Sequence, residues 1–178
     1  MPSASGPHQL ALALAHHESF AREDFLAGPS NAAALAFVEG WPDWPDRVLA
    51  LVGPPGSGKS HLAAIWAERA GARLMSARAL EEPSLGGALA TGALVLEDVR
   101  AGAFEEAALF HLLNLAREER AFLLLTSRTS PVGWPVRVPD LASRLRALPV
   151  AALDQASLRL QRPVNRALAA ATLRGLEP

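Results

Sequence analysis

The chain has 178 residues, 50% of them apolar, no cysteine and a formal net charge of −1 at pH 7, which suits one domain with a tail and excludes disulfides and thiolate metal sites. The near-neutral charge gives no bulk attraction to nucleic acid or to an anionic membrane, so any contact with DNA would be local or indirect. No apolar run approaches the roughly 20 residues that span a bilayer. A secretory signal begins with a positively charged segment, whereas no Lys or Arg precedes Arg22 here. We therefore expect a cytoplasmic protein without a membrane partner.

Residues 1–19 are expected to form a flexible tail that contains a short peptide with a docking pattern. Leu10, Leu12 and Leu14 follow Gln9 at alternate positions, so an extended chain would present all three leucines on one side. Such a peptide suits a groove on another protein. The alternative is a frayed strand or helix end that covers the core, since Leu and Ala also favour helix.

The next segment predicts a helix and a connection. Ser30 or Asn31 is expected to cap a helix over 32–39. A proline-rich connection over 40–46 then leads into the first strand.

The sequence is organised around an apolar run over 48–52, which predicts a buried strand, and the glycine-rich loop that follows it. Helical periodicity begins near the end of this loop, so the order is strand, loop and helix, as a P-loop requires. Successive N–H groups of such a loop point at a polyphosphate, and the helix adds the positive end of its dipole. The expected phosphate-binding residues are Gly53, Pro54, Pro55, Gly56, Ser57, Gly58, Lys59, Ser60 and His61.

Two side chains of this loop have distinct expected roles. Lys59 would reach the β- and γ-phosphates. It is the only lysine in a chain rich in arginine, so the chain keeps a compact ammonium at the one position where it suits a phosphate. The Ser60 hydroxyl would ligate Mg²⁺. The expected cofactors are therefore ATP or ADP with Mg²⁺. The alternative is a glycine turn that only joins a core strand to a core helix.

A short second strand over 72–75 and a loop over 81–91 come next. The apolar run over 93–96 then ends in the carboxylates of Glu97 and Asp98, which is the Walker-B pattern. The carboxyl end of a buried parallel strand lies at the ligand edge of the sheet. Glu97 would hold Mg²⁺ through water, and Asp98 would polarise an attacking water. A charged strand end in solvent is the alternative.

The remaining elements complete an alternation of strands and helices. Leu109, Leu112, Leu113 and Ala116 lie at helical spacing within 104–120. A buried strand over 121–126 ends at Ser127, Arg128 and Thr129, beside the expected γ-phosphate. The alternation predicts an α/β fold of the P-loop NTPase type, a parallel sheet with helices on both faces.

A helix is expected to start at Pro139, with Asp140 as its N-cap. Asp140 and Arg144 are four residues apart and could form a surface ion pair. The alternative is that Arg144 projects toward the nucleotide of a neighbouring molecule.

The P-loop, the Glu97-Asp98 pair and the stretch 109–114 together resemble the AAA+ module of the replication initiator DnaA. The stretch 25–31 is similar to the DnaA segment that lies near the adenine. The DnaA-related regulatory family of Hda and HdaA is more similar still. The stretch 139–145 of this sequence resembles the arginine-finger box of that family. The stretch from Gln9 to Leu14 resembles the hexapeptide with which that family binds the sliding clamp.

The resemblance implies an AAA+ core over 20–152 and a regulatory function. A clamp-bound member of the family presents an arginine, here Arg144, in trans to ATP held by DnaA, and hydrolysis of that ATP suppresses re-initiation of replication. The implied partners are DnaA and the β subunit of the DNA polymerase sliding clamp, with DNA contacted only indirectly and homo-oligomers a further option. The clamp-binding residues would be Gln9, Leu10, Leu12 and Leu14.

Three features depart from the family pattern. The Walker-B acids stand in reverse order, and the sensor-1 position falls on Ser127 or Arg128. Residues 153–178 are too few for a full helical lid and contain no recognisable sensor-2 box, so we expect a truncated lid with a residual helical segment. These departures favour a nucleotide-binding adaptor over an efficient enzyme. A stand-alone P-loop ATPase or a small phosphotransferase remains the alternative.

Overall fold

The computed structural model describes residues 20–154, and the expected clamp-binding residues Gln9, Leu10, Leu12 and Leu14 lie outside them. Within this range the chain builds one five-stranded sheet whose paired strands are all parallel, in the order β2-β3-β4-β1-β5. The strands are β1 (Val48–Val52), β2 (Arg73–Ser76), β3 (Ala93–Glu97), β4 (Phe122–Ser127) and β5 (Val150–Ala152).

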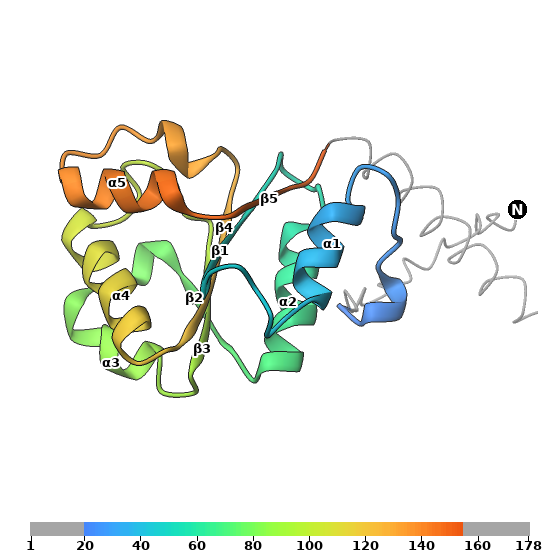
Figure 1. Ribbon diagram of the computed structural model, residues 1–178, viewed down its shortest axis with the longest axis horizontal. Helices are drawn as coiled ribbons and strands as arrows, with labels where there is room; N and C mark the ends of the chain where they lie inside the picture. Colours follow the sequence, from blue (N-terminus) through green and yellow to red (C-terminus); the bar gives the residue numbers. More distant parts are fainter. Residues whose placement is uncertain (1–19, 155–178) are drawn as a thin grey trace, which may run out of the picture.

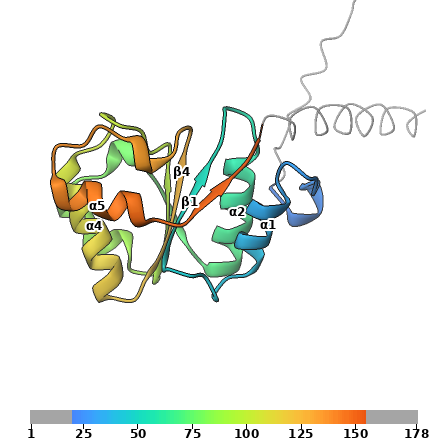
Figure 2. The ribbon, with the colours of Figure 1, turned by 45° about the horizontal axis from the view of Figure 1, so that its top comes forward.

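Helices cover both faces of the sheet, which Figure 1 shows nearly edge-on between two helical layers. The helices α1 (Ala32–Glu39) and α2 (Lys59–Ala70) cover one face, and α3 (Leu85–Ala88), α4 (Glu106–Glu118) and α5 (Pro139–Ala147) lie on the other side, an arrangement that the turned view in Figure 2 repeats. Short 3-10 turns lie at Arg22–Asp24, Ala77–Ala79, Glu82–Ser84 and Pro131–Gly133. The predicted parallel α/β fold is confirmed.

Two hydrophobic cores follow from the alternation of side chains along the strands. Leu94 and Leu96 of β3 pack into the core beneath α3, α4 and α5, whereas Ala93 and Val95 pack into the core beneath α1 and α2. A central strand therefore needs apolar residues at every position, which explains the continuous apolar runs in the sequence. The predicted apolar face of α4 is buried at Leu109, Leu112, Leu113 and Ala116.

Several predicted boundaries need correction. The segment 81–91, expected to be loop, contains a 3-10 turn and α3. Val138, not Asp140, is the N-cap of α5, and Asp140 lies in the first turn, where a carboxylate suits the helix dipole. The short strand β5 follows α5 and pairs with β1.

Asn31 is the N-cap residue of α1, but its side chain does not cap the helix. Its Oδ1 accepts a hydrogen bond from the Gly28 N–H at 2.8 Å, and its Nδ2 donates to the Leu26 carbonyl at 2.9 Å. The side chain is buried, and its two hydrogen bonds fix the preceding loop rather than the helix end.

None of the helices within residues 20–154 is long and apolar enough to cross a lipid bilayer.

Replacing Asn31 by alanine is expected to lower the free energy of unfolding by ~1–3 kcal/mol, because the Gly28 N–H and the Leu26 carbonyl lose their partner. Chemical denaturation followed by circular dichroism measures this change. The matched control is Asn114→Ala on α4, which should change stability by less than half as much. Equal effects of the two substitutions would show that the Asn31 side chain does not hold the loop.

Candidate functional site

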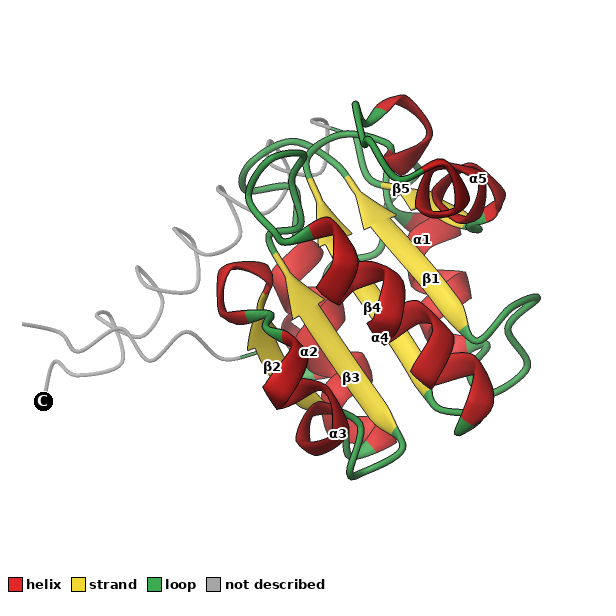
Figure 3. Cartoon of the chain, turned by 90° about the vertical axis from the view of Figure 1, so that its left-hand side faces the viewer, coloured by secondary structure: helices red, strands yellow, loops and turns green. Residues whose placement is uncertain are grey.

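The glycine-rich loop lies at the carboxyl end of β1, between this strand and the first turn of α2. In Figure 3 the strands point toward one edge of the sheet, and the loops that follow them gather there. The loop is anchored to the neighbouring strand by a hydrogen bond from the Gly53 N–H to the Ser127 carbonyl at 3.1 Å. This is the crevice beyond the strand ends where open parallel sheets bind ligands.

Three glycines shape the loop. A Cβ atom at Gly53 would lie 2.5 Å from the Leu153 carbonyl oxygen, so no other residue fits there without a backbone shift. Gly56 and Gly58 have φ angles of 73° and 97°, in the region that favours glycine. The loop can therefore curl and direct N–H groups inward, and the first-turn amides of α2 add further donors without intrahelical partners.

Lys59 turns its ammonium back over this loop. Its Nζ donates to the carbonyls of Gly53 at 2.7 Å and Pro54 at 2.8 Å, and lies 3.4 Å from the Ser57 Oγ. Partial burial is the main cause that lowers the pKa of Lys59, the charge of Arg128 lowers it further, and Asp98 acts in the opposite direction. The ammonium is thus only partly hydrated and lies where a polyphosphate would meet the loop.

Glu97 and Ser60 are suited to a shared cation. Glu97 is the last residue of β3, and by alternation its side chain lies on the sheet face covered by α1 and α2. Ser60 is in the first turn of that same α2. A Mg²⁺ ion held by this hydroxyl and carboxylate would take its other ligands from phosphate oxygens and water, as Mg²⁺ usually does.

Asp98 differs from Glu97 in its surroundings. Its φ of 58° is left-handed, and its N–H donates to the Thr126 Oγ1 at 3.0 Å. Its carboxylate forms an ion pair with Arg100, and the Arg128 Nε lies 4.0 Å from the other carboxylate oxygen. The candidate catalytic carboxylate is therefore engaged by two guanidiniums from the same chain.

The sensor-1 region separates into a structural residue and a charged one. Ser127 is buried, and its Oγ donates to the Thr129 carbonyl at 2.8 Å. Arg128 is exposed and reaches Asp98. Sequence reasoning missed Arg100, which belongs to no motif, and it missed the contact of Arg128 with Asp98, because no local pattern joins the end of β4 to the end of β3.

His61 connects α2 to the segment before α1. Its Nε2 lies 2.9 Å from the Ala21 carbonyl, and its ring meets Phe20 and Phe25 edge-on with centroids 5.6 and 5.3 Å apart. The structure thus brings the stretch that begins at Phe25 next to the P-loop helix. Of the other loop residues, Pro54 is half-buried and Pro55 is exposed.

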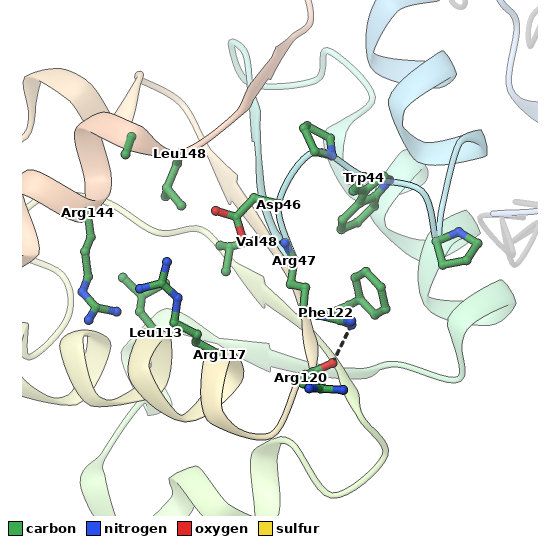
Figure 4. A pocket seen from close by; sticks show the side chains of 13 residues that line it. Trp44, Asp46, Arg47, Val48, Leu113, Arg117, Arg120, Phe122, Arg144 and Leu148 are labelled. Atoms are coloured by element: carbon green, nitrogen blue, oxygen red, sulfur yellow. Dashed lines mark hydrogen bonds between the residues drawn. The ribbon is translucent and has the colours of Figure 1, made fainter.

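Arg144 is not near this site. It lines a cavity of about 550 Å³ together with Arg47 and Val48, which lie at the amino end of β1, and Phe122 at the amino end of β4 (Figure 4). Its guanidinium carbon lies 5.1 Å from the ring centroid of Phe110. Within residues 20–154 Arg144 forms no ion pair with Asp140, so the surface ion pair considered for these two residues is not formed.

The sequence matches no family model and no curated protein. Solved structures do share its fold. AMPPCP-bound DnaA from Aquifex aeolicus superimposes with a TM-score of 0.62 at 20% identity, over 81% of this chain and 53% of that chain. Domain III of DnaA from Thermotoga maritima gives 0.55 at 22% identity, over 75% and 66%. RuvB R170A from Thermotoga maritima gives 0.50 at 21% identity, over 76% and 48%.

This chain spans about half of the length of the Aquifex DnaA chain (53%). The identities establish the fold and nothing finer. The fold is that of the P-loop NTPases of the AAA+ type, as the sequence predicted.

Replacing Lys59 by alanine should weaken ADP or ATP binding ~10- to 100-fold, because a charge-assisted contact of ~1.5–3 kcal/mol is lost. Titration calorimetry with each nucleotide measures the change. Arg69→Ala on the same helix is the control and should bind as the wild type does. Equal affinities for the wild type and the Lys59 variant would exclude a P-loop role for this lysine.

Replacing Arg100 by alanine should raise the chain's own ATP hydrolysis about tenfold, below the ~10²–10⁴ that a fully positioned base supplies. The reason is that the Asp98 carboxylate loses its closest cation, and the oxygen that Arg100 contacts becomes free to accept a hydrogen bond from water, while Arg128 stays near the other oxygen. Steady-state phosphate release measures the rate. The double variant Arg100→Ala/Asp98→Asn should lose the gain; a gain that survives it would assign the base elsewhere.

Proposed function

We propose that this protein is a nucleotide-binding regulator of chromosomal replication initiation that promotes hydrolysis of ATP bound to DnaA. It would act while tethered to the sliding clamp and would thereby prevent re-initiation. ATP or ADP with Mg²⁺ would be a structural ligand of the P-loop rather than a rapidly consumed substrate.

Nucleotide binding is supported by the geometry of the loop. The left-handed Gly56 and Gly58, the first turn of α2 and the Lys59 ammonium converge at one sheet edge. A DnaA of the same fold is bound to AMPPCP. Glu97 and Ser60 would hold Mg²⁺, which would neutralise charge on the phosphates.

The observation that carries the regulatory proposal is the position of Arg144. The P-loop follows the carboxyl end of β1, whereas Arg144 lines a cavity at the amino end of that strand. A five-residue strand is roughly 16 Å long. Arg144 therefore lies too far from its own P-loop to contact a nucleotide bound there, but it is accessible from outside the molecule.

A guanidinium in this position can act on another molecule. In comparable systems an arginine supplied in trans contributes ~10³–10⁵ to the rate of phosphoryl transfer, because it stabilises charge that develops on the transferring group. In this proposal Arg144 performs that role for ATP held by DnaA. The planar guanidinium matches phosphate oxygens in a way that a lysine does not.

Slow turnover of the chain's own nucleotide is consistent with the surroundings of Asp98. Its carboxylate is engaged by Arg100 and lies near Arg128, so it is not free to orient water. The second candidate function is a stand-alone P-loop ATPase. It is favoured by Glu97, which lies on the sheet face covered by α2, the helix whose first turn contains Ser60.

Tethering to the clamp is assigned to the peptide Gln9, Leu10, Leu12 and Leu14. This part of the proposal rests on the sequence pattern. The deciding experiment tests it by including or omitting the clamp. Hydrolysis of DnaA-bound ATP is measured with this protein alone, with DNA-loaded clamp, and with both together. Stimulation only in the last arm supports the tethered adaptor; ATP turnover by this protein in the absence of DnaA supports the stand-alone ATPase.

In the same assay, Arg144→Ala should abolish the stimulation of DnaA while leaving ADP binding and the melting temperature of this protein close to the wild type. Arg146→Ala on the same helix is the matched control, since Arg146 is exposed and does not line the cavity. Full stimulation by the Arg144 variant would disprove the in-trans role of this arginine.

A further inference from the structure

Arg144 lines a cavity with three other arginines, and the four come from four places in the fold. Arg144 comes from α5, Arg117 from the last turn of α4, Arg120 from the turn that follows it, and Arg47 from the residue before β1. Figure 4 shows these side chains around one hollow. We call these four residues the arginine pocket. Among residues 20–154, Asp46 is the only acidic residue that lines the cavity.

The charges of the arginine pocket are not neutralised by the part of the chain that the structure describes. The ion pairs among residues 20–154 are Arg22–Glu39, Arg100–Asp98, Arg128–Asp98 and His111–Glu82, and none includes an arginine of the pocket. Asp46 instead accepts the backbone N–H of Arg47 at 2.6 Å. The whole chain has a net charge of −1, so this local excess of cations is a specific feature of one surface.

Two of the guanidiniums are held in place by aromatic rings. The Arg47 guanidinium carbon lies 4.8 Å from the ring centroid of Phe122, and its Nη1 donates to the Arg120 carbonyl at 2.8 Å. Arg144 stands over the Phe110 ring in the same manner. Such stacking leaves the edge of the guanidinium, where its donors are, available for an anion. It also reduces the side-chain entropy that binding must remove.

Arg120 occupies a backbone position that glycine would fill at lower cost. Its φ of 56° is left-handed, at the residue that follows the C-cap Glu119 of α4. Helices commonly end with glycine in this conformation, because a Cβ is unfavourable there. An arginine at this site therefore brings a cation to the pocket at a cost in local stability.

We propose that the arginine pocket is the docking surface for the nucleotide-bearing face of the protein on which Arg144 acts, and that Arg117 and Arg120 bind carboxylates and phosphate oxygens of that face. This inference rests on the proposed function and extends it from one arginine to a surface. Arg144 contributes to the rate of hydrolysis, whereas Arg117 and Arg120 contribute to affinity. Their mixed apolar and cationic surroundings, with Leu113 and Leu148 in the same cavity, suit a protein surface.

The same features argue against nucleic acid as the occupant. Binding to a phosphate backbone calls for a basic stripe along an extended surface. Here the cations surround one concave cavity of about 550 Å³. Trp44, the largest aromatic residue of the lining, is buried in the core and stacks on Trp66, so it presents no free face to a base.

The test separates affinity from maximal rate. Full-length protein is titrated into DnaA–ATP with DNA-loaded clamp, and the half-saturating concentration and the maximal rate of hydrolysis are both measured. Arg117→Ala and Arg120→Gly should each raise the half-saturating concentration roughly tenfold with an unchanged maximal rate. Arg120→Gly should not lower the melting temperature, since glycine relieves the left-handed backbone. Arg146→Ala should match the wild type in every measurement.

Each remaining outcome has a definite meaning. If the wild type does not stimulate DnaA, the proposed function fails and this inference fails with it. If the wild type stimulates and both variants keep the wild-type half-saturating concentration, only the docking surface is disproved. Fluorescence titrations with single-stranded and duplex oligonucleotides supply the last arm. Weaker oligonucleotide binding by the variants, with unchanged binding to DnaA–ATP, would reassign the pocket to nucleic acid and overturn the proposal.

Discussion

The hydrogen bond from the Gly53 N–H to the Ser127 carbonyl fixes the start of the glycine-rich loop against the sheet, and the rest of the site depends on this anchor. There is no room for a Cβ atom at Gly53, because the Leu153 carbonyl oxygen is in the way. The loop must therefore leave β1 in one direction and return as the first turn of α2. This path sets the positions of Lys59 and Ser60, which begin α2. Glu97 lies at the same edge of the sheet because β3 ends there.

The parallel sheet has a second consequence for function, because its two edges are chemically separate. Carboxyl ends of strands meet at the P-loop edge, and amino ends meet at the arginine pocket. On the proposed function, the chain would bind one nucleotide at its own loop and offer guanidiniums to another molecule at the opposite edge. In this way the fold separates the proposed ligand-binding loop from the proposed action in trans.

Asp98 illustrates how a motif can be present and yet restrained. Its place after an apolar strand is typical of a catalytic carboxylate, but its left-handed backbone and its ion pair with Arg100 direct it toward the chain's own cations. Glu97, one residue earlier, is the last residue of β3, and by alternation its side chain lies on the sheet face covered by α2. Adjacent carboxylates thus have different roles open to them, because side chains alternate across a strand and the strand ends between them.

The sequence by itself determined the P-loop, the central strands β1, β3 and β4, and the apolar face of α4, since these depend on local periodicity and on glycine at positions that other residues cannot occupy. Only the tertiary structure decided that Arg144 lies at the amino edge beside Arg47, Arg117 and Arg120, and that Arg100 engages Asp98. The physical reason is that the four arginines of the pocket span residues 47 to 144 along the chain, so no local pattern in the sequence brings them together.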